Sequence, residues 1–403
     1  MLTYEQARQI VIEQVSKSRG PRVTETVSVW DALGSVLAEE IKADRPYPPF
    51  DRSLRDGYAV RSADTAAGAT LPCVGEIRAG DVVAQPLAAA TCLQIMTGAA
   101  VPPGADAVVM IEHTQRQADE VTFDRPAQPG QHIVPRGSES SADQVVLRAG
   151  ARLGFAELGL AAQVGAVKLV CARQPRVAIL STGDEVVLVD ETPGPFQIRN
   201  SNSVSLAAQV RLAGAEPIIL GNASDTREDL RARITQGLQA DALVLSGGVS
   251  MGKYDLVEAV LKELGTQFFF EAVAIRPGKP AVFGLCRNVP VFGLPGNPVS
   301  TMVTFGLFAA PAIDILSGAE PRALPLLLAT LAEELNEKPG MVHFLPAHVT
   351  WQGTQSHVTA LRWQSSGDVA AVAKSNCFLV VPADRDKISA GEKVSIWLRK
   401  DIA

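Results

Sequence analysis

The sequence predicts a multidomain protein that combines α/β and β structure, and three observations support this fold class. Strand-like and helix-like segments alternate over residues 175–320, which is typical of a doubly wound parallel α/β domain. Residues 46–145 are dense in glycine, proline and short alternating apolar runs, which indicates an inserted β-rich module. Short alternating runs return over residues 321–403 and predict a small C-terminal β-barrel.

The remaining segments predict a split helical or linker domain that the β-rich module interrupts. Residues 1–45 open with a capping box from Thr3 to Gln6 and apolar residues at helical spacing, so we expect an amphipathic helix rather than a signal peptide. Residues 146–174 are again apolar and helical in character, but they carry charges and are not expected to span a membrane. We expect the two pieces to pack together as one domain.

The α/β domain contains four strand-then-helix units. The four strand segments are RVAILST, EPIILGNA, DALVLSGG and VPVFGLPG, and an apolar helical pattern follows each of them. Gly214 should end the first helix, and Leu230, Ile234 and Leu238 lie on one face of the second. In a sheet of this kind the ligand binds in a crevice at the carboxyl ends of the strands.

Composition favours some classes of partner and argues against others. The formal net charge is −6 and no basic run occurs, so a nucleic-acid surface is not expected and the partner should be a small molecule or a protein. The five cysteines are scattered without CxxC spacing, which predicts reduced cysteines in a cytoplasmic protein. The five histidines show no spacing typical of metal ligands.

The loop SGGVSMGKYD, residues 246–255, is the strongest single signal for a site. Small residues that directly follow a buried strand let backbone N–H groups approach an anion, and a helix starting at Asp255 would add the positive end of its dipole. A plain turn is the alternative interpretation of a glycine-rich loop. The candidate anion-binding residues of this loop are Ser246, Gly247, Gly248 and Ser250.

Carboxylates follow three different strands of the predicted sheet. Glu185, Asp225 and Asp255 should therefore meet at one edge, where their oxygens could hold Mg²⁺ and leave other positions to water and a substrate phosphate. Asp225 and Asp255 each stand three residues before a glutamate, so each also fits a helix N-cap. The two interpretations are compatible, because a cap residue at this edge also faces the crevice. The same loop as Glu185 contributes Thr182, Gly183 and Asp184.

Two further loops bring cations and hydroxyls to the same edge. Arg276 and Lys279 in AIRPGKP would counter an oxyanion. Asn202 is a candidate that is also explained as a turn residue, as is its neighbour Asn200. The loop GLPGNPVS adds the candidates Pro295, Gly296, Asn297, Pro298 and Ser300.

Seven ordered motifs resemble one known family over nearly the whole chain. They are PFDRSLRDGYAVR (49–61), IMTGA (95–99), ILSTGDEV (179–186), SGGVSMGKYD (246–255), RPGKP (276–280), GLPGNPVS (293–300) and QSSGD (364–368). Together they resemble the molybdopterin molybdenumtransferase family, which comprises MoeA and the gephyrin E domain. The resemblance implies a homodimer of elongated four-domain subunits. It also implies that the α/β domain binds adenylylated molybdopterin, and that a metal-dependent step inserts molybdate into the dithiolene and releases AMP.

The resemblance also implies roles for individual residues. Asp56 and Thr97 of the inserted module would contribute to the site on the α/β domain of the partner subunit, and Glu139 would belong to the cofactor site. The acidic set Glu185, Asp225 and Asp255 would surround the cofactor phosphates and the metal, and with Asp56 and Lys279 it would form the catalytic group. The candidates for holding molybdate are Arg276, Lys279, Ser300 and Ser366. Other cofactor-biosynthesis proteins or apo molybdoenzymes are further candidate partners.

Several positions depart from the family pattern. Met341 and Pro346 stand where arginines are often found on both sides of a phenylalanine, and Arg362 is a candidate to compensate for them. Leu54 and Arg55 replace an Ala-Met pair in the inserted module, and Ser140 stands in place of an aspartate. Three hypotheses follow: an active molybdenumtransferase, a non-catalytic relative that binds pterin or serves as a scaffold, and a molybdopterin adenylyltransferase. The sequence leaves open whether the oxyanion is molybdate or tungstate, and which divalent ion is bound.

Overall fold

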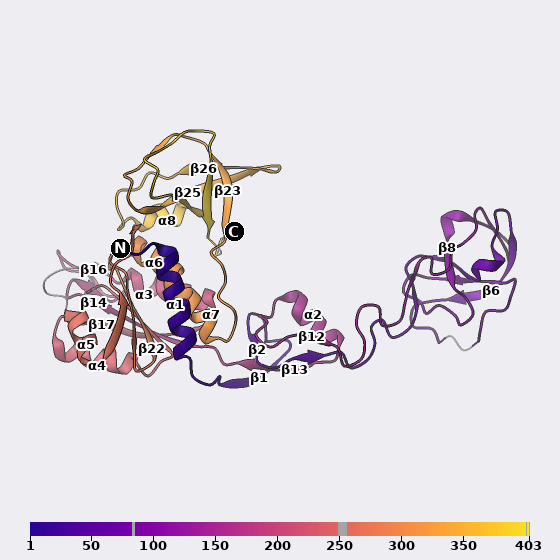
Figure 1. Ribbon diagram of the computed structural model, residues 1–403, viewed down its shortest axis with the longest axis horizontal. Helices are drawn as coiled ribbons and strands as arrows, with labels where there is room; N and C mark the ends of the chain where they lie inside the picture. The colour runs from indigo at the N-terminus through magenta and orange to yellow at the C-terminus, as the bar shows by residue number, and fades with distance from the viewer. Residues whose placement is uncertain (83–84, 249–255, 400, 403) are drawn as a thin grey trace.

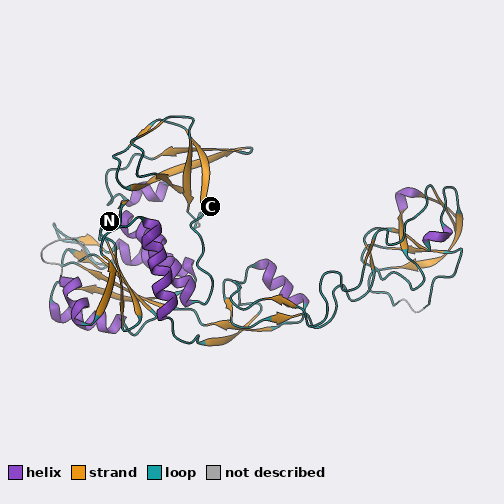
Figure 2. Cartoon of the chain, viewed as in Figure 1, coloured by secondary structure: helices purple, strands orange, loops and turns teal. Residues whose placement is uncertain are grey.

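The computed structural model describes residues 1–82, 85–248, 256–399 and 401–402 of the chain, and the molecule is elongated (Figure 1). An α/β domain and a β-barrel lie at one end, a small domain with a three-stranded sheet lies in the middle, and a β-rich module lies at the far end. Helices gather around the sheet of the α/β domain, whereas strands dominate the distal module and the barrel (Figure 2). This arrangement agrees with the predicted fold class.

The α/β domain is built on a six-stranded sheet. Its strand order is β17 (Glu216–Ala223), β14 (Arg176–Thr182), β18 (Ala242–Ser246), β22 (Val289–Leu294), β21 (Val282–Cys286) and β19 (Thr266–Phe270). The first four strands are the predicted ones and all pair in parallel. The last two pair antiparallel and extend the sheet on the β22 side. The carboxyl ends of β14, β18 and β22 therefore lie side by side.

Helices cover both faces of this sheet, because successive strand residues point to opposite sides. On one face, Val177 and Ile179 of β14 pack with α3, α6 and α7, and on the other Ala178 and Leu180 pack with α4 and α5. Gly214 ends α3 in the left-handed conformation (φ +90°), as the sequence predicts. The helices are α3 (Ser201–Ala213), α4 (Arg227–Gly237), α5 (Leu256–Glu263), α6 (Pro298–Thr304) and α7 (Ala310–Leu316), with a π-helical turn, Phe305–Ala309, between the last two.

The continuous helix Pro298–Leu316 meets the length and hydropathy that a membrane span needs. Its most apolar window is 78% buried inside the protein, as expected for the core helix of a folded domain. It packs against α1 and α3 in the main hydrophobic core.

The N-terminal helix α1 (Tyr4–Ser18) packs elsewhere than predicted. Its capping box forms as expected, because Thr3 and Gln6 exchange both hydrogen bonds. However, Ala7, Val11 and Val15 are fully buried in the core of the α/β domain and do not pack with residues 146–174. The apolar stripe of α1 lies along α7, which offers a longer apolar surface than the small middle domain.

The middle domain joins two distant parts of the chain, but as a mixed structure rather than a helical one. The sheet consists of β1 (Thr24–Ser28), β13 (Lys168–Ala172) and β2 (Val36–Leu37), and the helix α2 (Phe155–Gln163) lies beside it. The short run KLVCA was predicted as helix and is strand β13 instead. A short apolar run bounded by a glycine, here Gly165, does not distinguish a helix from a strand by periodicity.

The distal module contains a six-stranded sheet and connects to the middle domain through two strand pairs. Tyr58 and Phe123 meet edge to face in its core, with ring centroids 6.4 Å apart. The connecting pairs are β3 (Ile41–Lys42) with β12 (Val145–Leu147) and β4 (Arg52–Ser53) with β11 (Ile133–Val134). The sheet order is β8 (Ala107–Met110), β5 (Gly57–Val60), β7 (Cys92–Ile95), β6 (Thr70–Ile77), β10 (Glu120–Phe123) and β9 (Thr114–Gln117).

The C-terminal barrel closes because β25 pairs with both β26 and β27. Its strands are β23 (Leu326–Leu331), β25 (Val342–Gln352), β26 (Gln355–Ala360), β27 (Cys377–Val381) and β29 (Lys393–Leu398), and a short pair, β24 (Leu335–Asn336) and β28 (Lys387–Ile388), lies apart from them. Helix α8 (Val369–Lys374) precedes β27. The short strand β20 (Ile275–Arg276) of the α/β domain pairs with β25, so the two domains share a sheet edge.

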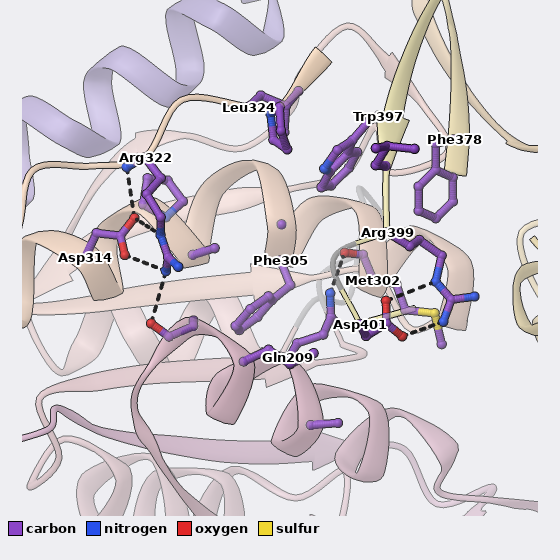
Figure 3. A pocket seen from close by; sticks show the side chains of 18 of the residues that line it. Gln209, Met302, Phe305, Asp314, Arg322, Leu324, Phe378, Trp397, Arg399 and Asp401 are labelled. Atoms are coloured by element: carbon purple, nitrogen blue, oxygen red, sulfur yellow. Dashed lines mark hydrogen bonds and ion pairs between the residues drawn. The ribbon is translucent and has the colours of Figure 1, made fainter. Parts of the chain in front are cut away.

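A buried carboxylate connects three parts of the molecule. Asp314 on α7 accepts hydrogen bonds from Arg152 Nη2 (3.0 Å) and Arg322 Nη2 (2.6 Å). Arg152 belongs to the middle domain, where it pairs with Val36, and Arg322 lies on the connection from α7 to the barrel. Figure 3 shows Asp314 and Arg322 on one side of an apolar cavity of about 290 Å³, with the barrel residues Trp397 and Phe378 on the other. We call Asp314, Arg152 and Arg322 the Asp314 joint.

Candidate functional site

A cavity of about 640 Å³ lies at the carboxyl ends of β14, β18 and β22. This is the crevice that the alternation of strands and helices predicts. Its walls come from the loops that follow these strands, from the start of α3 and from the barrel loop at Gly367. The predicted site residues that line it are Thr182, Gly183, Glu185, Asn202, Asp225, Ser246, Gly247, Gly248, Pro295, Gly296, Asn297 and Pro298.

The glycines after β18 are required by close packing. A Cβ atom on Gly247 would lie 2.7 Å from Thr182 O, and one on Gly248 would lie 2.5 Å from Val257 Cγ2. Both residues also have positive φ angles, which disfavour other side chains. The Gly247 N–H donates to Leu294 O (3.1 Å), so this amide holds two strand ends together and does not face a ligand. Ser250, which was predicted to continue this loop, lies outside the described residues.

Two buried polar atoms in the wall lack a hydrogen-bond partner among the described residues, and both point to a polar ligand. Asn202 Nδ2 donates to Ser246 Oγ and to Gly296 O, at 2.7 Å each, which fixes the amide between the loops after β18 and β22. Its Oδ1 is then left unpaired, and so is Thr182 Oγ1. A buried polar group without a partner is costly, so these atoms fit a ligand that offers hydrogen-bonding groups. Asn202 therefore does more than a turn residue would require.

Asn200 has a structural role instead. It caps helix α3, because its Oδ1 accepts the Ser203 N–H at 2.9 Å. Its Oδ1 also faces the Ser181 hydroxyl at 3.3 Å. The turn interpretation therefore suits Asn200, which serves the backbone, and not Asn202.

Three carboxylates gather at one side of the cavity. Asp184 Oδ1 accepts the Asp225 N–H at 3.1 Å, and the Glu185 carboxylate lies close above Gly183. Burial, followed by the negative charges of Asp184 and Glu185, raises the pKa of Asp225. Positive charge placed beside these carboxylates would relieve the repulsion.

Asp225 is not the N-cap of α4, because the helix is capped by the next residue. Thr226 is the N-cap of α4, and its hydroxyl accepts the Asp229 N–H. Asp225 is therefore free of this role and lines the cavity. Within the described ranges, no group of three His, Cys, Asp or Glu side chains is close enough to hold a metal. The third predicted ligand, Asp255, lies outside those ranges.

The candidates for holding molybdate lie beside the cavity rather than in its lining. The RPGKP loop packs on α6, since a Cβ atom on Gly278 would lie 2.5 Å from Thr304 Cγ2 and 3.7 Å from Ser300 O. Val299 N–H donates to Ser366 O at 2.9 Å, which brings the QSSGD loop to the same helix start. The loops that carry Arg276, Lys279, Ser300 and Ser366 therefore converge at the start of α6, and their neighbours Pro280 and Gly367 line the cavity.

Two of the positions that depart from the family pattern, Met341 and Pro346, lie on or beside β25, the barrel strand that pairs with the strand carrying Arg276. Met341 directly precedes Val342, whose N–H donates to Ala274 O (3.0 Å) next to the strand that carries Arg276. Pro346 O accepts the Leu361 N–H at 2.8 Å, so Arg362 lies one residue from the partner of Pro346. Arg362 is exposed.

The predicted residues of the inserted module lie far from the cavity of the same chain, at the other end of the molecule (Figure 1). Thr97 donates to Asp56 Oδ1 from its backbone N–H (2.6 Å) and its hydroxyl (2.7 Å), and these hydrogen bonds lower the pKa of Asp56. Glu139 forms an ion pair with Arg52 at 2.7 Å. Asp56 and Thr97 thus form a preorganised pair that lies apart from the cavity of their own chain.

Among the cavity-lining residues that the sequence analysis did not predict, Arg199 is the one with a charged side chain. It ends β16 (Ile198–Arg199), which pairs in parallel with β15 (Val186–Val187). The chain leaves the crevice after Glu185, and this pairing brings it back at Arg199. A signal was available, because Arg199 directly precedes Asn200 and Asn202 in the segment IRNSN.

The fold and the crevice define a class of protein, since the α/β domain over residues 178–314 matches the family model described as a probable molybdopterin binding domain. Residues 2–165 match the MoeA N-terminal region (domain I and II), and residues 329–398 match the MoeA C-terminal region (domain IV). The three matches follow one another in the order of a single family.

Curated relatives identify that family over almost the full length. The chain is 37% identical to the molybdopterin molybdenumtransferase of Haemophilus influenzae over 98% of each protein, and 33% identical to that of Bacillus subtilis over 94% of this chain and 90% of the relative. Two structures of the MoeA protein from Pyrococcus horikoshii superpose with TM-scores of 0.82 and 0.75, at 27% and 31% identity, and each covers 99% of this chain and at least 99% of the other. The chain belongs to the molybdopterin molybdenumtransferase (MoeA) family and has a role in molybdenum cofactor biosynthesis.

Proposed function

We propose that this transferase inserts molybdate into adenylylated molybdopterin and releases AMP in a Mg²⁺-dependent step. The observation that carries the proposal is the composition of the crevice wall. Unpartnered polar atoms of Thr182 and Asn202 lie beside the carboxylates of Glu185 and Asp225 in one cavity. The first pair suits the hydrogen-bonding groups of a pterin or a phosphate, and the second pair suits a cation bound next to that phosphate.

Each group of residues has a distinct task in this proposal. Glu185 and Asp225, with Asp255 as the expected third carboxylate, would hold Mg²⁺, which when bound supplies positive charge beside the phosphate oxygens. Asn202 is held rigidly by its two hydrogen bonds, so its Oδ1 can orient a donor group of the substrate. The convergent loops at the start of α6 would present Arg276, Lys279, Ser300 and Ser366 to the molybdate dianion.

We further propose that the protein acts as a homodimer with shared sites. Asp56 and Thr97 lie far from the cavity of their own chain, so a second copy must supply the cavity that they complete (Figure 1). Exposed aromatic side chains on the middle domain, Trp30 and Phe155, support an interface there. A cytoplasmic location is proposed as well, because all five cysteines are unpaired and buried.

The test of the proposed function uses purified protein, adenylylated molybdopterin, molybdate and Mg²⁺. AMP release and reconstitution of an apo molybdoenzyme are the two readouts. Asp225→Asn should abolish both, whereas the matched control Asp241→Asn, at the opposite end of the sheet, should retain both. Wild-type protein that binds the adenylate but yields neither AMP nor cofactor, with or without Mg²⁺, would contradict the proposal.

That negative outcome would favour the non-catalytic alternative. Met341 and Pro346 support this alternative, because two arginines of the family pattern are then absent beside the molybdate loops.

The adenylyltransferase alternative makes a different prediction. It requires the protein to consume ATP and release pyrophosphate with molybdopterin as acceptor. Measuring pyrophosphate release in the absence of molybdate separates the two activities.

A further inference from the structure

A single cation contributes to the lining of the crevice as far as the structure describes it. Arg199 is the one lysine or arginine among those lining residues, which also include the carboxylates Glu185 and Asp225. Arg199 is exposed, and none of the ion pairs among the described residues involves it. Its charge is therefore available to a ligand, while the neighbouring wall is acidic.

The loop that carries Arg199 holds it in a defined place. Ile198 N–H donates to Glu185 O (2.8 Å), and Asn200 N–H donates to Val187 O (2.9 Å), which forms the parallel pairing of β15 and β16. The Arg199 side chain itself donates from Nε to Glu191 O at 3.1 Å. One loop thus fixes the Glu185 backbone and the Arg199 guanidinium at the rim, and the terminal nitrogens of Arg199 are left for other acceptors.

The charges of the substrate make this arrangement meaningful. Adenylylated molybdopterin carries two linked phosphates, whereas molybdopterin before adenylylation carries a single terminal phosphate. The carboxylates of Glu185 and Asp225 repel either form, and without a metal ion only a cation in the wall offsets that repulsion. A guanidinium suits this task, because it stays charged and presents paired N–H donors to phosphate oxygens.

We propose that Arg199 binds the diphosphate of the adenylylated substrate and thereby selects it over the monophosphate form. The inference rests on the proposed function, because it takes the adenylylated pterin as the ligand of this crevice. It makes Arg199 a specificity-determining residue in direct contact with substrate. The pairing of β15 with β16 then connects Arg199, the cation that binds the substrate, to Glu185.

The experiment measures binding of adenylylated and non-adenylylated molybdopterin to the full-length protein by calorimetry, in EDTA so that no metal contributes. Arg199→Gln should lower the affinity for the adenylylated form by about 10- to 100-fold, which is the loss expected for one charge-assisted contact. The affinity for the monophosphate form should change by less than about threefold, because the lost contact is to the second phosphate. Arg199→Lys should recover part of the loss, since it retains charge without the planar fork.

A matched control is available on the same domain. Arg176 is also exposed and donates to a backbone carbonyl, Gln239 O at 3.1 Å, but it lies at the amino end of β14 away from the crevice. Arg176→Gln should leave both affinities unchanged. Equal affinities of Arg199→Gln and wild type for the adenylylated form would overturn the inference and leave the proposed function intact. Wild-type protein that binds neither pterin would instead overturn the proposed function, and the role of Arg199 with it.

Discussion

The Asp314 joint yields the sharpest test of how this elongated molecule is held together. Asp314 is only 2% exposed, and it accepts hydrogen bonds from Arg152, from the Arg322 guanidinium and from the Arg322 backbone N–H (2.9 Å). Arg152 also donates to Gly34 O (2.9 Å) in the middle domain, and Arg322 donates to Ala213 O (3.1 Å) at the end of α3. Replacing Asp314 by asparagine removes the charge that both guanidinium groups share.

The size of the effect follows from burial. Removing one partner of a buried ion pair costs about 3–5 kcal/mol, because the remaining charge stays without compensation. The arginine side chains are 24% and 36% exposed, so water relieves part of this cost and we expect about 3 kcal/mol for Asp314→Asn. With a urea m-value of about 3 kcal/mol/M, the midpoint of the transition should fall by about 1 M.

Tryptophan fluorescence is a suitable probe, because Trp397 lines the cavity next to the joint. The control is Glu334→Gln, which makes the same chemical change at the exposed pair with Lys387 (2.9 Å, Glu334 49% exposed) and should leave the midpoint nearly unchanged, because water already solvates both charges. The reasoning is refuted if the transition followed by tryptophan fluorescence moves no further in Asp314→Asn than in Glu334→Gln.

Three further predictions concern the proposed site. Burial and neighbouring carboxylates raise the pKa of Asp225, so its ionisation opposes folding above that pKa. In EDTA, Asp225→Asn should thus have a higher urea midpoint than wild type at pH 7, and the difference should shrink as the pH falls through the raised pKa; growth of the difference on acidification would contradict this. Mixed dimers of Asp56→Ala and Asp225→Ala subunits should recover about half of the wild-type AMP release per dimer, because one of the two shared sites is intact; verified heterodimers without activity would exclude shared sites. Calorimetry with molybdate should show weak binding that Lys279→Ala abolishes, whereas Arg362→Ala weakens it only if Arg362 replaces the absent arginines; unchanged binding in Lys279→Ala would remove that residue from the site.

The fold of the α/β domain follows from local patterns, and the parts that do not follow depend on distant contacts. The four parallel strands and the end of α3 at Gly214 are set by alternation and by a glycine conformation, both of which are visible in the sequence. The position of α1 is different, because its apolar stripe fits any apolar surface, and only the folded chain shows that α7 provides it. The same holds for β13, which becomes a strand by pairing with β1.

The candidate site shows the same division. Thr182, Glu185, Asn202 and Asp225 line the cavity as expected, since loops at the carboxyl ends of parallel strands must meet. The assignment of Asp225 as a cap failed because aspartate and threonine are both good N-caps and are adjacent here. Arg199 was missed because its place depends on the pairing of β15 with β16, which no local pattern in the loop predicts.

The two parts of the proposed site are held by different physical means, and this separates binding from transfer. The crevice is fixed by the hydrogen bonds of Asn202 and by the packing of Gly247 and Gly248, all within the α/β domain. In the proposed homodimer, the position of Asp56 relative to a crevice depends instead on the Asp314 joint and on the contact between subunits. A change at the joint should therefore reduce AMP release while pterin affinity stays near that of wild type. A change at Asn202 should weaken pterin binding itself, because its unpaired oxygen belongs to a residue that lines the crevice proposed to bind the pterin.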